Sequence, residues 1–514
     1  MDRIPWRVEM SGCSAAMSGR RMKLKSILVA ALLMSAVLAG QATAGTTIHR
    51  QPGLMLGLSG GADPNLVSGD QTSMAAWAER ARSVGTQTVR LGVSWSSIAP
   101  STWPAGFNPA DPASAGYRWT TLDAQIGQLA SEGFKVFLTV DSAPVWAEGS
   151  GMPSYATPGS WEPNDYQLEQ FARALATRYS GHYQGLPQVS EFQAWNEPNM
   201  STFLAPQYRN ESGSCAVTSG YWTGTGAESP TLYRGLLNAF YRGVKSVSPA
   251  DTVVMAGLAP YSSPNCISST PPDYRISPVA FARATFCLNS NDRKLRGCNV
   301  QANFDGIDSH PYPPPWSGLG PTWSDSYQLD TAVPDIYRIN KVLQAAQRQG
   351  TVKRGKFSSW VTELAWDTNP PDSTGVTPMK AADWIEQGIY ILYKQGVNHI
   401  LWWQLGDISN FQSSEWPGAA GLFTAAGVAK PGATAFYFPF VTARAGASHL
   451  TAWGRAPVAG VLRIERLSGR HWVTVASGHV SADEVFQTSL TQHGAGTFRA
   501  IVGSHSSLSW HQGR

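Results

Sequence analysis

The stretch EFQAWNEPN at Glu191–Asn199 decides the fold that we predict for this chain. An apolar, β-prone run with Val189, Phe192, Ala194 and Trp195 ends abruptly in Asn196, Glu197 and Pro198. Proline has no backbone N–H and cannot continue a central strand, so a strand must end here. In α/β barrels the carboxyl ends of the strands carry the chemistry, which makes Glu197 a candidate catalytic residue.

A second carboxylate stands near the end of another β-prone run. Trp360–Trp366 reads WVTELAW, and its Glu363 follows Glu197 by 166 positions (363 − 197). Two glutamates at strand tips are the groups that cleave a glycosidic bond through paired carboxylates. Either glutamate alone could be an ordinary loop or salt-bridge residue, so the prediction depends on the two together.

Strand-like and helix-like segments alternate through most of the chain. The expected strands are Gly53–Gly60, Gln87–Trp95, Lys135–Ser142, Val189–Trp195, Thr252–Ala259, Phe304–Ser309, Phe357–Trp366 and His399–Asp407. Segments with helical periodicity, such as Leu232–Val247, lie between them. Near-continuous apolar strands joined by helices predict a parallel sheet. Eight such units predict an α/β fold, a (β/α)8 TIM barrel over residues 45–440.

The helical period disappears after about Phe440. Short strand-like runs such as Val461–Arg466 and Phe498–Val502 are separated by Gly, Ser and Arg. They predict a small all-β sandwich over residues 441–514. This module could bind sugar, but the lack of a flexible linker before it favours a lid that packs on the barrel.

Residues 1–44 have the pattern of a secretory signal peptide. A basic segment precedes the apolar run Ile27–Gly40, and Ala42-Thr43-Ala44 offers a small-residue cleavage site. Met22 is an alternative start, and Arg20-Arg21 in the longer leader matches a twin-arginine element poorly. The apolar run is short for a membrane span, so an uncleaved anchor is the lesser alternative. We therefore expect a secreted or periplasmic protein with no membrane association after cleavage.

Composition narrows the function further. Lys+Arg of 39 against Asp+Glu of 35 gives a net charge of +4, too mild to indicate a nucleic-acid partner or an anionic membrane. The 20 tryptophans suit a carbohydrate partner, because the C–H faces of sugars stack on aromatic rings, although most will be core residues.

The cysteines point to disulfides. Cys13 leaves with the leader, and an even number remains for an oxidising compartment. Three pairings of the four are possible, and the shorter loops favour Cys287–Cys298 and Cys215–Cys266. No C-x-x-C spacing occurs, which argues against a zinc site.

Several motifs together resemble the retaining glycoside hydrolases of clan A. The matching segments are VRLGVSWSSIAP, WNEPN, DSHPY, VTEL and LWWQLGD, on the second, fourth, sixth, seventh and eighth expected strands. The resemblance covers roughly Gly53–Phe440 and is nearest to family 39, whose members often carry a β-sandwich after the barrel. The segment on the second strand looks more like family 5. The resemblance implies a (β/α)8 barrel, glutamates that end strands four and seven, and no cofactor.

The resemblance also implies roles for the residues in these motifs. Glu197 would be the general acid/base and Glu363 the nucleophile. Asn196 would hold the 2-hydroxyl of the sugar, although it could be only a turn residue before proline. Tyr312 would hydrogen-bond the nucleophile. His310 would line the catalytic subsite, although a histidine in a proline-rich loop is often a surface residue.

Two further kinds of residue complete the expected site. Arg90 is flanked by apolar residues inside its strand, so its charge needs a partner, and the nucleophile would provide one. Trp403 is the favoured floor of the sugar subsite. Other tryptophan candidates are Trp95, Trp146, Trp366 and Trp402.

The sequence therefore predicts a secreted, monomeric, retaining glycosidase that acts on a poly- or oligosaccharide. A carbohydrate-binding protein that has lost turnover is one alternative, but both glutamates and their supporting residues are present. A transglycosylase is the other alternative, because it shares every catalytic residue and differs only in whether water or a sugar is the acceptor.

Overall fold

The computed structural model describes residues 48–60, 66, 71–209, 211, 226–262, 273–314, 318–412 and 417–513. The expected leader and the cysteines Cys13, Cys215 and Cys266 lie outside these ranges. Within the described ranges, no helix combines the length and the apolar character needed to cross a membrane.

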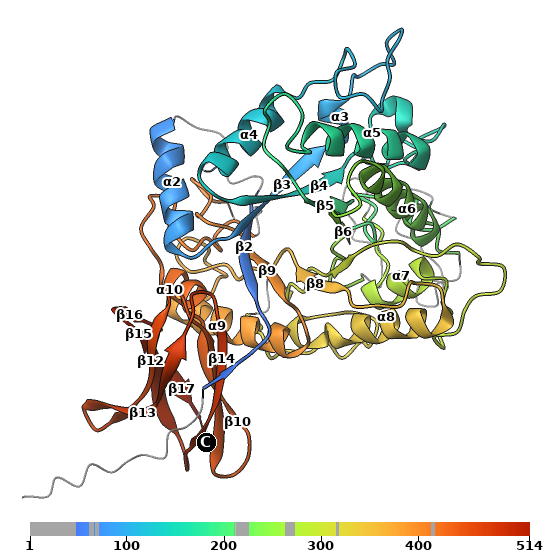
Figure 1. Cartoon of the computed structure of the whole chain (residues 1–514). Coiled ribbons are helices and arrows are strands. Elements are labelled where there is room, and N and C mark those ends of the chain that lie inside the picture. Colours follow the sequence, from blue (N-terminus) through green and yellow to red (C-terminus); the bar gives the residue numbers. More distant parts are fainter. Residues whose placement is uncertain are drawn as a thin grey trace, which may run out of the picture. The chain divides into compact units, whose positions relative to one another are not determined.

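Eight parallel strands close into a barrel, which confirms the predicted fold class (Figure 1). In chain order they are β2 (Met55–Ser59), β3 (Thr88–Ser94), β4 (Lys135–Asp141), β5 (Glu191–Ala194), β6 (Thr252–Met255), β7 (Gly306–Asp308), β8 (Ser358–Val361) and β9 (His399–Trp402). The ring closes where Met55 of β2 pairs with His399 of β9. The strands end earlier than expected, so Trp195 and Glu363 both lie beyond the last strand residue.

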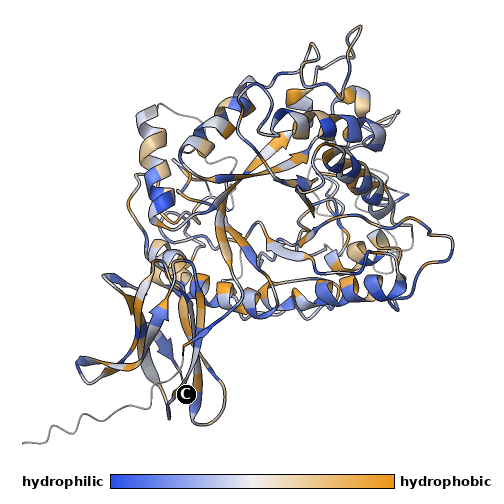
Figure 2. Ribbon diagram, in the orientation of Figure 1, coloured by the Kyte–Doolittle hydropathy of each residue, from blue (hydrophilic) through white to orange (hydrophobic). Residues whose placement is uncertain are grey.

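Helices surround the barrel strands (Figure 1). They are α2 (Gln71–Ser83), α3 (Trp95–Ile98), α4 (Thr120–Ser131), α5 (Asp165–Arg178), α6 (Ser229–Val247), α7 (Pro278–Thr285), α8 (Tyr337–Gln349), α9 (Pro378–Lys394) and α10 (Pro431–Tyr437), with short 3-10 turns η1 (Val145–Ala147) and η3 (Val333–Asp335). In α5, buried Leu168, Phe171 and Leu175 recur at helical spacing and face the strands. Figure 2 shows the same preference, with hydrophobic residues concentrated along the barrel strands.

The interior of the barrel changes from apolar to polar along the strands. Phe137, Val254, Trp360 and Leu401 form a buried cluster there. Because side chains alternate along a strand, the next inward residues toward the carboxyl end are two positions later. They include Thr139, Thr362 and Trp403. The apolar layer is thus a floor for a polar layer above it.

The C-terminal module is a β-sandwich, as predicted. One antiparallel sheet has the order β1 (His49–Arg50), β14 (Val485–Thr491), β11 (His449–Arg455) and β10 (Phe440–Arg444). The other contains β13 (His471–Val480), β12 (Gly460–Ser468), β15 (Gly496–Val502), β16 (His505–Ser506) and β17 (Trp510–Gln512). Phe440 and Phe486 from one sheet and Ile464 and Phe498 from the other share one buried core.

The sandwich packs directly on the barrel. Trp453 of β11 is fully buried, and its ring centroid lies 5.4 Å from that of Tyr390 and 5.2 Å from that of Tyr393, both in α9. Arg455, also in β11, donates from Nε to the carbonyl oxygen of Leu54 at 3.1 Å. These contacts join the two parts through buried side chains and favour the packed-lid interpretation of the module.

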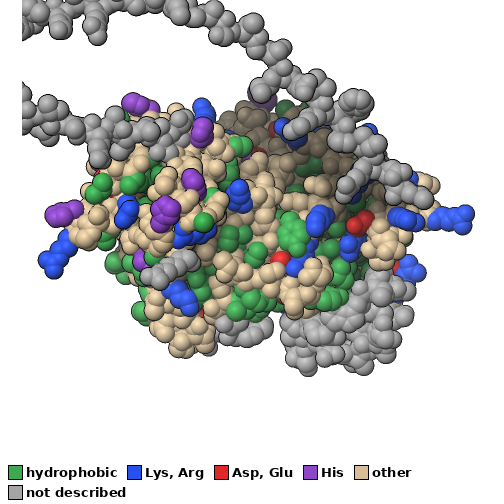
Figure 3. Space-filling view, turned by 90° about the horizontal axis from the view of Figure 1, so that it is seen from below, with side chains coloured by type: hydrophobic (Ala, Val, Ile, Leu, Met, Phe, Trp, Pro, Cys, Tyr) green, Lys and Arg blue, Asp and Glu red, His purple; other side chains and the backbone are tan. Residues whose placement is uncertain are grey.

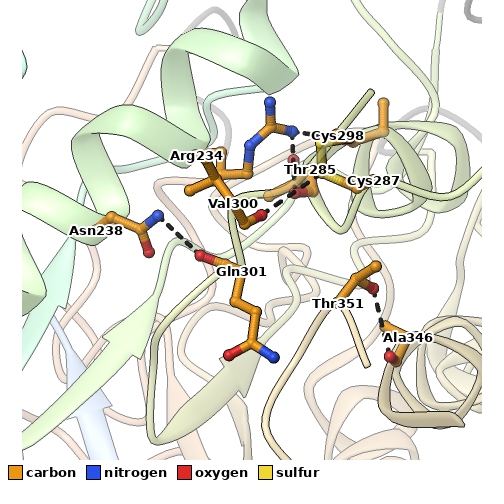
Figure 4. The surroundings of a disulfide bond; sticks show 10 residues. Arg234, Asn238, Thr285, Cys287, Cys298, Val300, Gln301, Ala346 and Thr351 are labelled. Carbon is orange, nitrogen blue, oxygen red and sulfur yellow. Dashed lines mark hydrogen bonds between the residues drawn. A yellow bond between two sulfur atoms is a disulfide. The ribbon is translucent and has the colours of Figure 1, made fainter. Parts of the chain in front are cut away.

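Cys287 and Cys298 form a disulfide, which confirms one of the two favoured pairings (Figure 4). The bridge closes the segment that follows α7. The residues just after Cys298 are hydrogen-bonded to α6, where Asn238 Nδ2 donates to the carbonyl oxygen of Gln301 at 2.9 Å. The disulfide therefore stabilises a connection on the outside of the barrel.

Charged side chains of both signs are mixed at the surface. On the face seen in Figure 3, Lys and Arg side chains are spread among uncharged ones. Some of the surface cations pair with acids, as Arg242 does with Glu169 at 2.6 Å and Lys353 with Asp305 at 2.9 Å. This distribution agrees with the mild net charge of +4.

Candidate active site

Closure of the barrel brings Glu197 and Glu363 together at the carboxyl end of the strands. Glu197 follows the end of β5 and Glu363 follows the end of β8. One oxygen of each carboxylate lies within 4.8 Å of the other. Each side chain is 13% exposed, so both are shielded but reachable.

The backbone around Glu197 is unusual for residues that are not glycine. Trp195 and Glu197 both have positive φ, 76° and 35°. Such conformations are costly and are found where the surrounding structure holds them, often at functional sites. The backbone N–H of Glu197 donates to the carbonyl oxygen of Gly257 at 3.1 Å, which anchors the bend.

Glu363 is surrounded by hydrogen-bond donors. Arg90 Nη1 lies 2.5 Å from Oε1, and Tyr312 Oη donates to Oε2 at 3.1 Å. Burial and the charges of Glu363 and Glu197 raise the pKa of Tyr312 well above its usual value. Tyr312 therefore keeps its proton and remains a donor to Glu363.

Arg90 connects Glu363 to Asn196. Its guanidinium is buried, and Nη2 donates to Asn196 Oδ1 at 2.7 Å. The remaining donors contact inward-facing residues: Nε donates to Thr139 Oγ1 at 2.7 Å and Nη1 to Ser59 Oγ at 3.1 Å. Because Arg90 takes Oδ1 of Asn196, the amide N–H groups of Asn196 are the ones left to meet a ligand.

His310 lies between the two glutamates. It is fully buried, and Nδ1 is 2.9 Å from Glu197 Oε1 and 3.6 Å from Glu363 Oε2. On the other side of the ring, Nε2 is 3.0 Å from Thr362 Oγ1. Burial lowers the pKa of His310, but the charge of Glu363, the attraction of Asp308 3.7 Å from Nε2 and the hydrogen bond with Glu197 outweigh it and raise the pKa to about 10.

The same three side chains could in principle hold a metal ion. One ligand atom from each of Glu197, His310 and Glu363 lies within 4.8 Å of the others. A metal ion at this position would have to displace the proton on Nδ1 of His310, because metals bind the lone pair of a neutral imidazole nitrogen.

The predicted tryptophans divide into two groups. Trp403 is partly exposed and packs against Tyr312, Ala365 and Ala420, so it borders the site. Trp146 is also partly exposed, but its ring contacts Trp95, Trp103 and Phe107.

The other tryptophan candidates are buried in the core. Trp95 is 0%, Trp402 1% and Trp366 5% exposed. Trp95 stacks on Phe171, and Trp402 contacts Trp366 with ring centroids 5.8 Å apart. Trp402 precedes the site-bordering Trp403 by one position, and adjacent strand residues point to opposite faces.

Several residues of the site were not singled out in the sequence. Five inward-facing polar residues connect Arg90 and His310 beneath the glutamates. They are Ser59, Thr139, Gln193, Asp308 and Thr362. Their signal is a polar residue at an inward position of an otherwise apolar strand, which is visible only once the register is known.

Asp141 is a further carboxyl near this network. Asp141 is the last residue of β4. Burial raises its pKa, and the nearby charge of Glu363 raises it further. A hydrogen bond from Ser142 and the charge of Arg90 act in the opposite direction. Its position on the carboxyl side of β4 places it at the same end of the barrel as the glutamates.

No family model matches the chain, and no curated protein matches it. Solved structures do. A family 39 glycoside hydrolase from Bacteroides cellulosilyticus WH2 matches with a TM-score of 0.50 and 15% identity, over 85% of this chain and 80% of that chain. The GH39 enzyme from Xanthomonas axonopodis pv. citri matches with a TM-score of 0.50 and 16% identity, over 88% and 96%. At these identities the likeness shows a shared fold.

Proposed function

We propose that this chain is a retaining glycoside hydrolase in which Glu363 is the nucleophile and Glu197 the general acid/base. The observation that carries the proposal is the pair of carboxylates at the barrel mouth, in which one oxygen of Glu197 lies within 4.8 Å of one oxygen of Glu363. Retaining enzymes hold their carboxyls about 5–5.5 Å apart, whereas inverting enzymes need about 6.5–9.5 Å to admit a water. The spacing here supports double displacement.

In the first step Glu363 attacks the anomeric carbon and the glycosidic bond breaks. Glu197 gives its proton to the departing oxygen, so the leaving group departs as a neutral alcohol. Arg90 donates to one oxygen of Glu363 and Tyr312 to the other, which limits the rotation of the carboxylate during the attack. The product of this step is a glycosyl ester on Glu363.

In the second step water attacks the anomeric carbon of the glycosyl ester and displaces Glu363. Glu197 is now ionised and accepts a proton from the attacking water, while the ester bond to Glu363 breaks and returns a carboxylate. Two displacements restore the original anomeric configuration. The amide of Asn196, whose oxygen accepts from Arg90, would hold a sugar hydroxyl in both steps.

The solved structures with the same fold agree with this proposal, because both are described as family 39 glycoside hydrolases. Trp403 would offer its partly exposed ring to the sugar. We propose a poly- or oligosaccharide as the substrate and no cofactor, since each step needs only the side chains named.

Product stereochemistry tests the proposal. The chain would be incubated with a panel of polysaccharides and aryl glycosides, and the first product followed by NMR. We expect retention. Glu363→Ala should abolish turnover while its melting temperature stays close to that of the wild type. Glu197→Ala should lose most activity on substrates with poor leaving groups and far less on those with acidic phenols. Inversion, or full activity in Glu363→Ala, would overturn the assignment.

We also propose that the protein is exported and begins near Gly45 after cleavage. The Cys287–Cys298 disulfide supports this, because such bonds persist in oxidising compartments. N-terminal sequencing of the exported protein tests the proposal, and an intact Met1 or Met22 would contradict it.

A further inference from the structure

The hydrogen bonds around His310 determine where its protons lie. Thr362 Oγ1 is 2.5 Å from Asp308 Oδ2 and 3.0 Å from His310 Nε2. Asp308 also accepts N–H bonds from Ser309, Thr362 and Gln193, so it is surrounded by donors and acts as an ionised acceptor. The single hydroxyl hydrogen of Thr362 therefore goes to Asp308. The Thr362 oxygen can then only accept from His310, and Nε2 carries a hydrogen.

The second ring nitrogen faces carboxylate oxygens. Nδ1 is 2.9 Å from Glu197 Oε1 and 3.6 Å from Glu363 Oε2. In the mechanism above at least one of these carboxylates is ionised at every stage. As the acid, Glu197 must carry its proton on Oε2 to reach the leaving oxygen, because Oε1 lies 2.9 Å from Nδ1. Oε1 is then an acceptor in both halves of the reaction, so Nδ1 carries a hydrogen as well. Two protonated nitrogens make His310 an imidazolium.

We propose that Asp308, acting through Thr362, holds His310 as an imidazolium whose Nδ1–H serves whichever glutamate is ionised in each half of the reaction. Asp308 and Thr362 are positioning residues, because they act through His310 and contact neither glutamate carboxylate among the bonds described. The inference rests on the proposed function, in which the negative charge moves from Glu363 to Glu197.

The charges of the site stay balanced during this exchange. In the first half Arg90 and His310 are positive, and Glu363 and Asp308 are negative. In the second half Glu363 is a neutral ester and Glu197 has become the negative group, so there are again two charges of each sign. A fixed imidazolium within 3.6 Å of both carboxylates can follow the charge with little movement. Such preorganised donors need no rearrangement during the reaction.

The other surroundings of His310 contain few competing groups. Gly257, which follows β6, presents only backbone to the ring, and a Cβ there would lie 2.0 Å from Nε2. Tyr312 has its ring centroid 6.5 Å from that of His310 and keeps its proton. Tyr233 of α6 lies behind Asp308, and burial raises its pKa beyond the physiological range. Among the described residues, the charged groups around His310 are thus Glu197, Glu363 and Asp308, with Arg90 beyond Glu363.

Nitrogen NMR of the full chain labelled with 15N-histidine tests the proposal without a substrate. The ring signals of His310 are assigned from their loss in His310→Gln. In the wild type we expect both nitrogens to stay protonated to at least about pH 8. In Asp308→Asn the titration midpoint should fall by about 1–3 pH units, because removal of an opposite charge within 4–6 Å has an effect of that size. Asp335→Asn, which changes a buried aspartate in η3, is the control and should leave the titration unchanged.

Thr362 provides a second route to the same answer if Asp308→Asn does not fold. Thr362→Val removes the oxygen that accepts from Nε2 and should also lower the midpoint, whereas Thr362→Ser should restore it. A neutral His310 at pH 7 in the wild type would overturn the proposal. An unchanged midpoint in folded Asp308→Asn or Thr362→Val would overturn it too.

Kinetics separate this inference from the proposed function. If the wild type hydrolyses an aryl glycoside, Asp308→Asn should add a new ionisation to the alkaline limb of its kcat/KM profile, which Asp335→Asn should lack. An imidazolium observed by NMR in a chain without glycosidase activity would reject the proposed function and leave the proton assignment standing. Retaining hydrolysis by a chain with neutral His310 would support the proposed function and reject the proton assignment.

Discussion

Gly257→Ala is the change that most directly tests the packing behind the site. Gly257 follows β6, and the imidazole of His310 lies against its Cα. A Cβ at this position would lie 2.0 Å from Nε2, 2.3 Å from Cδ2 and 2.7 Å from Cε1 of His310. Ordinary Cβ contacts begin near 3.4 Å, so the ring must retreat by about 1.4 Å (3.4 − 2.0).

A shift of that size breaks the alignment of the ring with both of its partners. If the ring moves by more than 1 Å, both of its short contacts are lost. These are the 3.0 Å contact of Nε2 with Thr362 and the 2.9 Å contact of Nδ1 with Glu197. Misplacement of a group in the site by about 1 Å can reduce the rate by about 10²-fold. Overpacking also destabilises a core by about 1–3 kcal/mol. We expect a folded protein with kcat/KM reduced by about 10²-fold.

The assay is kcat/KM on any aryl glycoside that the wild type cleaves, with the melting temperature measured in parallel. Gly127→Ala is the matched control, because Gly127 lies in α4, where a Cβ would meet no atom of the described residues within 4 Å and where alanine is favoured over glycine. It should keep full activity and be slightly more stable. A folded Gly257→Ala variant with wild-type kcat/KM would refute the importance of the position of His310.

Three further expectations concern stability. Burial raises the pKa of Glu386 in α9 well above its usual value, so the folded chain keeps a proton that the unfolded chain loses above about pH 4.5. The stability of the chain should therefore fall as the pH rises above about 4.5. Glu386→Gln should raise the melting temperature at pH 7 and flatten its decline with pH. A melting temperature with the same pH dependence as that of the wild type would contradict this. Replacing Cys287 and Cys298 by serine should lower the free energy of unfolding by about 3 kcal/mol, measured with urea under non-reducing conditions, and a loss below about 0.5 kcal/mol would count against a structural role. Trp453→Ala should cost about 3–5 kcal/mol at the junction with Tyr390 while kcat is retained, and a stable variant that binds polysaccharide poorly would favour a binding module instead.

The sequence alone was sufficient for the barrel and for the position of two glutamates at the carboxyl end of its strands. Alternating apolar strands and amphipathic helices have few stable closures, so the (β/α)8 fold follows from pattern. No strand can continue past Pro198, so Glu197 must lie at or beyond the carboxyl end of its strand, which ends at Ala194. The buried charge of Arg90 requires a carboxylate, and the structure shows Glu363 in that place. Each of these inferences depends on local chemistry or on a single compulsory partner.

Other features depend on which face of a strand a residue occupies. Trp402 and Trp403 are neighbours of the same type, yet Trp402 is buried and Trp403 borders the site. A shift of the register by one residue exchanges these positions, and composition does not reveal the register. The expected strands also ran past their true ends, and the candidates Trp95 and Trp366, which follow those ends, are buried.

The relation between the glutamates and His310 was decided by the tertiary structure alone. Glu197, His310 and Glu363 follow three different strands, and barrel closure sets their separation. The connection from His310 through Thr362 to Asp308 joins β7 to the end of β8. Distances between residues more than 50 positions apart are fixed by strand pairing and by the packing beneath them, and no local pattern in the sequence encodes them.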